Sequence, residues 1–205
     1  MGRTQEERRE QTQSAVLTAT VESLIDVGYG KTTTLEVQRR AGVSRGALLH
    51  HFPSKADLIS ATVHHLAELR GRELRELAVK LPDGAARVGA VIDQLWHSFR
   101  GPLFCVAAEL RSAARTDVEL RGVLAKVEAE VRERILDQAR RLFGEPVASS
   151  PGFECAMDMT LQLMVGAAST AILHGDNRRV VALINRWKKL FPQLLEQANE
   201  QRIKV

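Results

Sequence analysis

The chain has 205 residues, of which 44% are hydrophobic, and carries a formal net charge of +4 with a pI near 9.4. This is long enough for one or two domains with a buried core, and the basic balance permits nucleic-acid binding without establishing it. Two distant cysteines, Cys105 and Cys155, exclude a disulfide framework. We expect both to be small buried residues in a reducing cytoplasm. The polar first residues, MGRTQEERREQ, are not expected to form a signal peptide.

Helical periodicity dominates the chain, and no convincing run alternates as a strand does. The first helix has one apolar stripe, formed by Leu17, Val21, Leu24 and Ile25. We therefore expect an all-α protein of about nine helices.

Residues 32–55, TTTLEVQRRAGVSRGALLHHFPSK, have the pattern of two short helices joined by a tight turn. Thr33 is expected to cap the first short helix. Glu36 follows three residues later, at the spacing of a capping box in which each side chain satisfies a backbone N–H. The pattern predicts a helix-turn-helix, which places one helix in the major groove of DNA.

The turn and the second short helix have their own local signals. Gly42 suits the left-handed residue that ends a helix, because it has no Cβ. Ser44 is a good N-cap for the second helix, expected at about Arg45–His51, and Pro53 should end it. This second helix is the predicted recognition helix.

The sequence AGVSRGALLHHFPSKADL resembles the signature of the tetracycline-repressor (TetR) family of transcriptional regulators. The upstream TATVESLIDVGYGKTTT is similar to the family as well, so the resemblance covers about residues 10–60. It implies a three-helix DNA-binding domain over residues 1–54 and a helical regulatory and dimerisation domain over residues 55–205. It also implies a ligand-responsive repressor, since most members of the family repress.

Predicted DNA contacts lie mainly on the recognition helix. Base contacts are expected from Arg45, Ala47, Leu49 and His50, with Arg45 as the candidate for a guanine or, equally, a phosphate. Phosphate contacts are expected from Thr32, Thr33, His51 and Lys55. Ser44 and Gly46 complete the predicted set. Ser44 caps the recognition helix, and Gly46 lets the helix backbone approach the DNA closely. The family usually has tyrosine at the position of Leu49, so the contact there should be lost or apolar.

Long helices are expected after the motif. Their approximate ranges are 55–81, 88–99, 103–114, 117–143, 153–174 and 178–201. Pro192 should kink or interrupt the last of them. The segment 155–173 is apolar enough to raise the question of a membrane span, but Asp158 and Gln162 within it favour a helix buried in protein.

The resemblance implies a homodimer on a pseudo-palindromic operator. The predicted dimer interface consists of Gly166, Thr170, Ile184, Trp187, Phe191 and Leu195. These small and apolar residues could pair helices across a two-fold axis, although an ordinary intramolecular core would use the same residues.

The resemblance also implies a small-molecule pocket among the middle helices. Its predicted lining is Leu66, Trp96, His97, Phe99, Phe104, Cys105, Glu109, Leu161 and Met164. Such a lining suits a largely hydrophobic effector, although apolar residues at helical spacing are also typical of a core. No cofactor is expected.

Other classes of protein find less support. No HExxH, CxxC or glycine-rich phosphate loop occurs, which argues against an enzyme and against catalytic residues. The adjacent pairs His50-His51 and His64-His65 lack the i, i+4 spacing of a metal site, so no metal is expected. A metal- or redox-sensing regulator, using Cys105, Cys155 and His97 as ligands in the metal-sensing case, stays an alternative, as does a helical protein with no DNA role.

Overall fold

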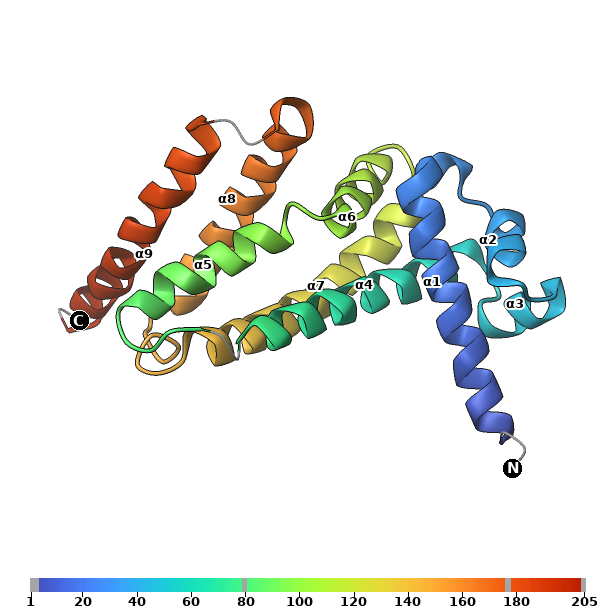
Figure 1. Cartoon of the computed structure of the whole chain (residues 1–205), viewed down its shortest axis with the longest axis horizontal. Helices are drawn as coiled ribbons and strands as arrows, with labels where there is room; N and C mark the ends of the chain where they lie inside the picture. Colours follow the sequence, from blue (N-terminus) through green and yellow to red (C-terminus); the bar gives the residue numbers. More distant parts are fainter. Residues whose placement is uncertain (1–3, 79–80, 176–177, 204–205) are drawn as a thin grey trace. The chain divides into compact units, whose positions relative to one another are not determined.

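The computed structural model describes residues 4–78, 81–175 and 178–203, except for the side chains of 77–78 and 197–203. Within these residues the chain forms nine helices and no strand, which confirms the all-α prediction (Figure 1). The helices are α1 (Gln5–Lys31), α2 (Thr34–Ala41), α3 (Arg45–His51), α4 (Lys55–Ala78), α5 (Ala86–Ser98), α6 (Pro102–Ala113), α7 (Val118–Phe143), α8 (Phe153–His174) and α9 (Arg178–Ile203).

The helices are distributed between two compact units. The head unit comprises the residues up to Leu69 together with Cys105–Val131, and the body unit comprises Arg70–Phe104 and the residues from Arg132 onward. The head unit therefore contains α1, α2, α3 and parts of α4, α6 and α7. The boundary predicted between residues 54 and 55 falls inside the head unit, at the start of α4, and stays a prediction.

The head unit is built around one side of α1, beside which α2 and α3 lie (Figure 1). Its core consists of Val16, Leu17, Ala19, Val37, Leu48, Phe52 and Leu58. The first three come from α1, and the others come from α2, α3, the residue after α3, and α4. Val37 and Leu48, with the partly buried Ala41 and Val43 beside them, pack the helix-turn-helix against α1.

Aromatic contacts organise the body unit. The rings of Phe143 and Phe191 stack with centroids 4.9 Å apart, and Phe153 meets Phe143 edge-on at 5.6 Å. Nearby, the Trp187 indole N–H donates to the Thr160 hydroxyl at 3.0 Å. These contacts join the end of α7 to α8 and α9, whose apolar faces are thereby buried.

Helix α8 is long and apolar enough to cross a membrane by length and composition. It nevertheless buries Met157, Thr160 and Met164 in the body unit. Its Asp158 forms an ion pair with Arg132 of α7 at 2.6 Å, which gives the charge a partner. These contacts are typical of the core helix of a folded protein, as predicted.

Helix α9 runs without interruption through Pro192, so of the two outcomes predicted there, a kink or an interruption, the interruption does not occur. The expectation that both cysteines are buried was wrong. Cys105 of α6 and Cys155 of α8 are both exposed. Cysteine was expected inside only from its general preference for buried positions.

Candidate nucleic-acid interface

Helix α2 begins at a side-chain cap. The Thr33 hydroxyl accepts the N–H of Glu36 at 3.2 Å, as predicted. The predicted return bond from Glu36 is absent from the described contacts, because its carboxylate binds the guanidinium groups of Arg39 and Arg40 instead. Half of the capping box therefore forms, and the other half is replaced by ion pairs three and four residues along the helix.

The turn and α3 follow the sequence signals closely. Gly42 has φ 65° and ψ 29°, the left-handed conformation that glycine adopts at little cost. The Ser44 hydroxyl accepts the N–H of Ala47 at 3.1 Å and caps α3. Leu48 is 1% exposed and anchors α3 to the core, which turns the opposite side of the helix outward.

The pentapeptide Gly42–Gly46 also has the spacing GxSxG that hydrolases use for a nucleophilic serine. That motif requires a turn between a strand and a helix, so that the serine is presented above a sheet. Here the turn joins two helices, and the Ser44 hydroxyl is used as an N-cap. The local structure therefore gives Ser44 a structural role.

The outward side of α3 presents most of the predicted contact residues. Arg45, Gly46, Leu49 and His50 are exposed, whereas Ala47 and His51 are half-buried. Leu49 has 39% of its surface exposed, so an apolar group stands among these polar side chains. Burial lowers the pKa of His51, and the charges of His50 and Arg9 lower it further, so the neutral imidazole is favoured.

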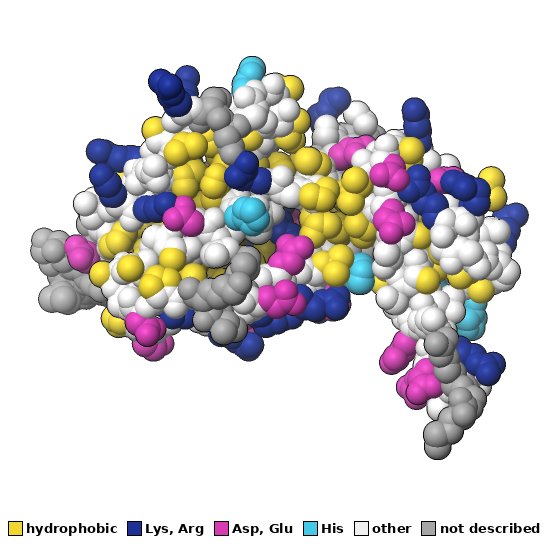
Figure 2. Space-filling view, in the orientation of Figure 1, with side chains coloured by type: hydrophobic (Ala, Val, Ile, Leu, Met, Phe, Trp, Pro, Cys, Tyr) yellow, Lys and Arg dark blue, Asp and Glu magenta, His cyan; other side chains and the backbone are white. Residues whose placement is uncertain are grey.

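Positive and negative side chains alternate over the helices of the head (Figure 2). The guanidinium of Arg40 bridges Asp26 and Glu36, each at 2.6 Å, and Arg39 binds Glu36. These hydrogen bonds, first from Arg39 and then from Arg40, lower the pKa of Glu36 to about 2. No ion pair to Arg45 occurs among the described residues, so its cation is available to DNA.

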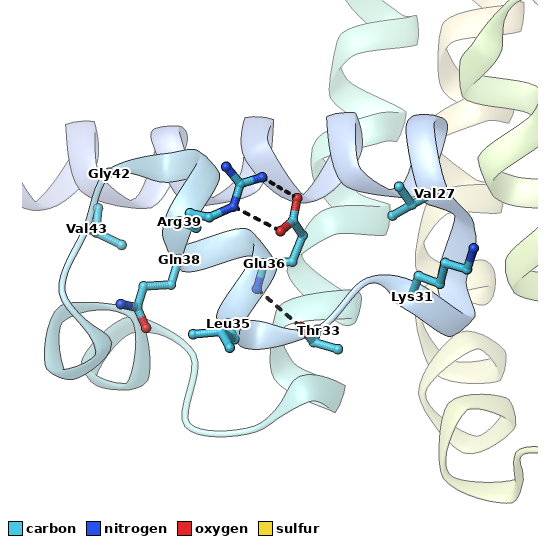
Figure 3. A pocket seen from close by; sticks show the side chains of 9 residues that line it. All are labelled: Val27, Lys31, Thr33, Leu35, Glu36, Gln38, Arg39, Gly42 and Val43. Atoms are coloured by element: carbon cyan, nitrogen blue, oxygen red, sulfur yellow. Dashed lines mark hydrogen bonds and ion pairs between the residues drawn. The ribbon is translucent and has the colours of Figure 1, made fainter.

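An open hollow of about 760 Å³ lies along α2 (Figure 3). It is lined by Val27, Lys31, Thr33, Leu35, Glu36, Gln38, Arg39, Gly42 and Val43. Leu35 is 71% exposed at its rim. The hollow is a surface groove beside the N-terminus of α2, where Thr33 is exposed as a phosphate contact requires.

Two predicted phosphate contacts have partners inside the head. Thr32 is 2% exposed, and its hydroxyl bonds to the Gly28 carbonyl at 2.8 Å and to Ser23 at 3.0 Å. It therefore has no exposed hydroxyl for a phosphate. The Lys55 ammonium lies 4.0 Å from the centroid of the Tyr29 ring, where the half-buried side chain is held close to the start of α4.

Arg9 is a candidate contact that the motif did not reveal. It precedes Val16 by seven residues, about two helical turns, so it lies on the face of α1 that packs against α3 and α4. Arg9 is exposed, and its charge contributes to the lowered pKa of His51. The continuation of the core-facing stripe into a basic residue was the available sequence signal.

Comparisons with known proteins agree with this geometry. Residues 16–62 match the family described as "Bacterial regulatory proteins, tetR family". An uncharacterised HTH-type transcriptional regulator of Mycobacterium tuberculosis is 31% identical over 168 residues, which are 82% of this chain and 86% of the relative. The chain belongs to the TetR family. A further relative, the transcriptional regulator CymR of Pseudomonas putida, is 35% identical over 127 residues, which are 62% of this chain and 63% of CymR.

Solved structures show the same fold at low identity. Salmonella enterica GusR has a TM-score of 0.63 and 20% identity, covering 90% of this chain and 95% of GusR. A TetR transcription regulator from Haloarcula marismortui has a TM-score of 0.60 and 16% identity, covering 92% of this chain and 98% of that protein. The TetR architecture thus extends over the described helices of both units.

The residues predicted to line an effector pocket are distributed over both units. Leu66, Trp96, Phe99, Phe104 and Met164 are buried, Leu161 and Glu109 are half-buried, and His97 and Cys105 are exposed. The Glu109 carboxylate accepts the backbone N–H of Tyr29, a partner that an effector would have to displace. The pocket stays a prediction.

The predicted dimer residues fall into two groups. Ile184, Trp187, Phe191 and Leu195 are at most 7% exposed and belong to the core of their own chain. Gly166 and Thr170 of α8 are exposed. The four α9 residues thus form part of an ordinary intramolecular core, which was the alternative to a dimer interface, because α9 packs against α5 and α8. No cluster of three or more potential metal ligands occurs in the described part of the chain.

Proposed function

We propose that this TetR-family regulator is a cytoplasmic, ligand-responsive repressor that binds a pseudo-palindromic operator as a homodimer. The exposed Arg45 cation on the capped helix α3 carries the DNA-reading part of the proposal, because guanidinium groups recognise guanine in the major groove. Thr33, Lys55 and Arg9 supply phosphate contacts around it. A bound dimer would repress by occupying the promoter.

An exposed stripe on α8 supports the dimer. Met159, Leu163, Gly166, Thr170 and Leu173 follow one another at intervals of four and three residues, which places them on one face. Leu173 is 78% exposed and Met159 is 45% exposed. No atom lies within 4 Å of where a Cβ on Gly166 would stand, so a helix from a second copy can approach closely.

The operator can be found by selection. The purified full-length protein is used to enrich a random duplex library, and the recovered sequences are compared. We expect an inverted repeat whose half-sites are separated by about one DNA turn, ~34 Å, or more. Recovery of no sequence preference, or of a single unrepeated site, would contradict the proposal.

The dimer surface has a matched pair of variants. Thr170→Arg places a cation in the stripe and should convert the dimer to a monomer in sedimentation velocity. Ser169→Arg adds the same charge at the adjacent exposed position and should leave the dimer intact. A wild-type monomer, or dimers in both variants, would remove this surface from the proposal.

A largely hydrophobic small molecule is the proposed effector, because the predicted lining is mostly apolar. A complete switch requires the effector to prefer one conformer by ~5.5 kcal/mol. Compounds that raise the melting temperature would be tested for release of the selected operator. Metal analysis of the purified protein tests the metal-sensing alternative, which bound stoichiometric metal would favour.

A further inference from the structure

Four residues of the head unit meet at the end of α1: Tyr29, Lys55, Glu109 and Asp117, which we call the Tyr29 cluster. The backbone N–H of Tyr29 donates to the Glu109 carboxylate at 2.5 Å, and its hydroxyl donates to Asp117 at 3.0 Å. The Lys55 ammonium lies over the ring of the same tyrosine. Two acidic residues 80 and 88 positions along the chain therefore contact the same residue, Tyr29, one through its backbone and one through its side chain.

Gly28 makes the contact with Glu109 possible. It has φ 77° and ψ 175°, which breaks the helical conformation near the end of α1. A Cβ at this position would stand 2.5 Å from the Glu109 Oε1 atom, so any other residue would have to displace the carboxylate. The break and the absence of a side chain together let Glu109 of α6 reach the backbone of α1.

Asp117 uses both of its carboxylate oxygens. Oδ2 accepts the Tyr29 hydroxyl, and Oδ1 accepts the N–H of Leu120 at 2.9 Å in the first turn of α7. The bond from Leu120 and then the bond from Tyr29 lower the pKa of Asp117, and the Lys55 charge lowers it further. The start of α7 is thereby attached to the end of α1 through an ionised carboxylate.

The cluster lies next to the DNA-binding elements along the chain. Tyr29 precedes Thr33, the cap of α2, by four residues, and Lys55 is the first residue of α4. A shift of the tyrosine would therefore displace both a helix start and a cation that face the DNA in the proposed complex.

We propose that Glu109 and Asp117 are positioning residues for DNA binding, which act through Tyr29 on the start of α2 and on Lys55. This inference rests on the proposed DNA-binding function. Operator affinity then depends on α6 and the start of α7, although neither residue needs to contact DNA.

The test uses full-length protein and the operator recovered by selection. Tyr29→Phe removes one oxygen atom and keeps the ring under Lys55, while Glu109→Ala removes the acceptor of the backbone N–H. Glu109→Gln keeps an acceptor of the same size. Glu22→Gln changes the charge of an exposed glutamate in the middle of α1 and serves as the control.

Dissociation constants are measured over a range of salt concentrations, with thermal melting of each variant. Tyr29→Phe and Glu109→Ala should weaken operator binding at least about threefold. The slope of the logarithm of affinity against the logarithm of salt concentration should also become shallower, by up to the amount that corresponds to about one phosphate contact. Glu109→Gln and Glu22→Gln should bind as the wild type does. A merely structural role would lower the melting temperature without changing the salt dependence.

The chain has one tyrosine, so fluorotyrosine gives a single fluorine resonance that reports on the cluster. It should shift in Asp117→Asn and in Glu109→Ala, but not in Glu22→Gln. A folded Tyr29→Phe variant with wild-type affinity and salt dependence would overturn the positioning role, even if Glu109→Ala fails to fold. A wild-type protein that selects no DNA would instead overturn the proposed function.

Discussion

The head unit fixes its short helices with hydrogen bonds between residues close in sequence, whereas the body unit depends on aromatic contacts between distant residues. In the head, Thr33 and Ser44 each bond to an N–H three residues ahead. In the body, Phe143 stacks on Phe191, which lies on a different helix. The conformation of a short helix such as α3 can therefore be specified locally, whereas the helices of the body must be specified by their packing.

The strongest test of this difference is Phe191→Ala. Phe191 is 0% exposed and contacts both Phe143 and Trp187, so its truncation should cost about 3–5 kcal/mol of unfolding free energy. Urea denaturation of the full chain measures this loss. Leu183→Ala, at an exposed position of the same helix, should change stability by less than about 0.5 kcal/mol. Equal losses in both variants would contradict the packing argument.

Arg45→Ala tests the head. Loss of a bidentate base contact should cost about 1–3 kcal/mol in operator binding and relax specificity at one position of each half-site. Binding assays with the selected operator and single-base variants measure both effects. Arg39→Ala is the control, because its guanidinium already binds Glu36. If Arg45→Ala leaves both the operator affinity and the base preference unchanged, other residues must contact the bases.

Ser44→Ala tests the local cap. Removing the acceptor of the Ala47 N–H should destabilise the helix-turn-helix by about 1 kcal/mol, without a comparable change in the aromatic core. Hydrogen exchange of the amides of α3 measures this loss locally. Ser14→Ala, at an exposed position in the middle of α1, is the matched control. Faster exchange throughout α9 would show that the two units are not independently specified.

The smallest expected effect concerns Tyr29. Burial, then the hydrogen bond to Asp117, raises the pKa of Tyr29 to about 12 from its ordinary value of 10.0. The folded state therefore holds this proton more tightly, and the stabilisation is complete below pH 10 and lost as the pH rises toward 12. Phenolate absorbance should show the high pKa in the wild type and a lower one in Asp117→Asn. An ordinary pKa in the folded wild type would contradict the cluster.

Local chemistry made the head largely predictable. Gly42, Ser44 and Pro53 act through their own backbone preferences or through N–H groups nearby, so their roles are visible in the sequence. The prediction for Glu36 was half wrong because two arginines at helical spacing provide ion pairs that replace its capping bond. A spacing rule identifies possible partners but does not rank them.

Contacts between distant residues were the unpredictable part. Nothing near Tyr29 in the sequence indicates Asp117, and the partner of Glu109 depends on a break in α1. Periodicity correctly predicted apolar faces on α9, but it could not decide whether Trp187 and Ile184 face their own chain or a second copy. That decision depends on how α9 rotates against α5 and α8.

The bond between Trp187 and Thr160 has a mechanical consequence for the body unit. The Thr160 hydroxyl donates to the Ala156 carbonyl and accepts the indole N–H, so both groups are satisfied away from water. If α9 slid along α8 by one turn, about 5.4 Å, the indole N–H would be stranded in an apolar environment at a cost of about 1–3 kcal/mol. The hydrogen bond therefore opposes translation of α9 along α8, while small tilts of the two helices can keep it intact.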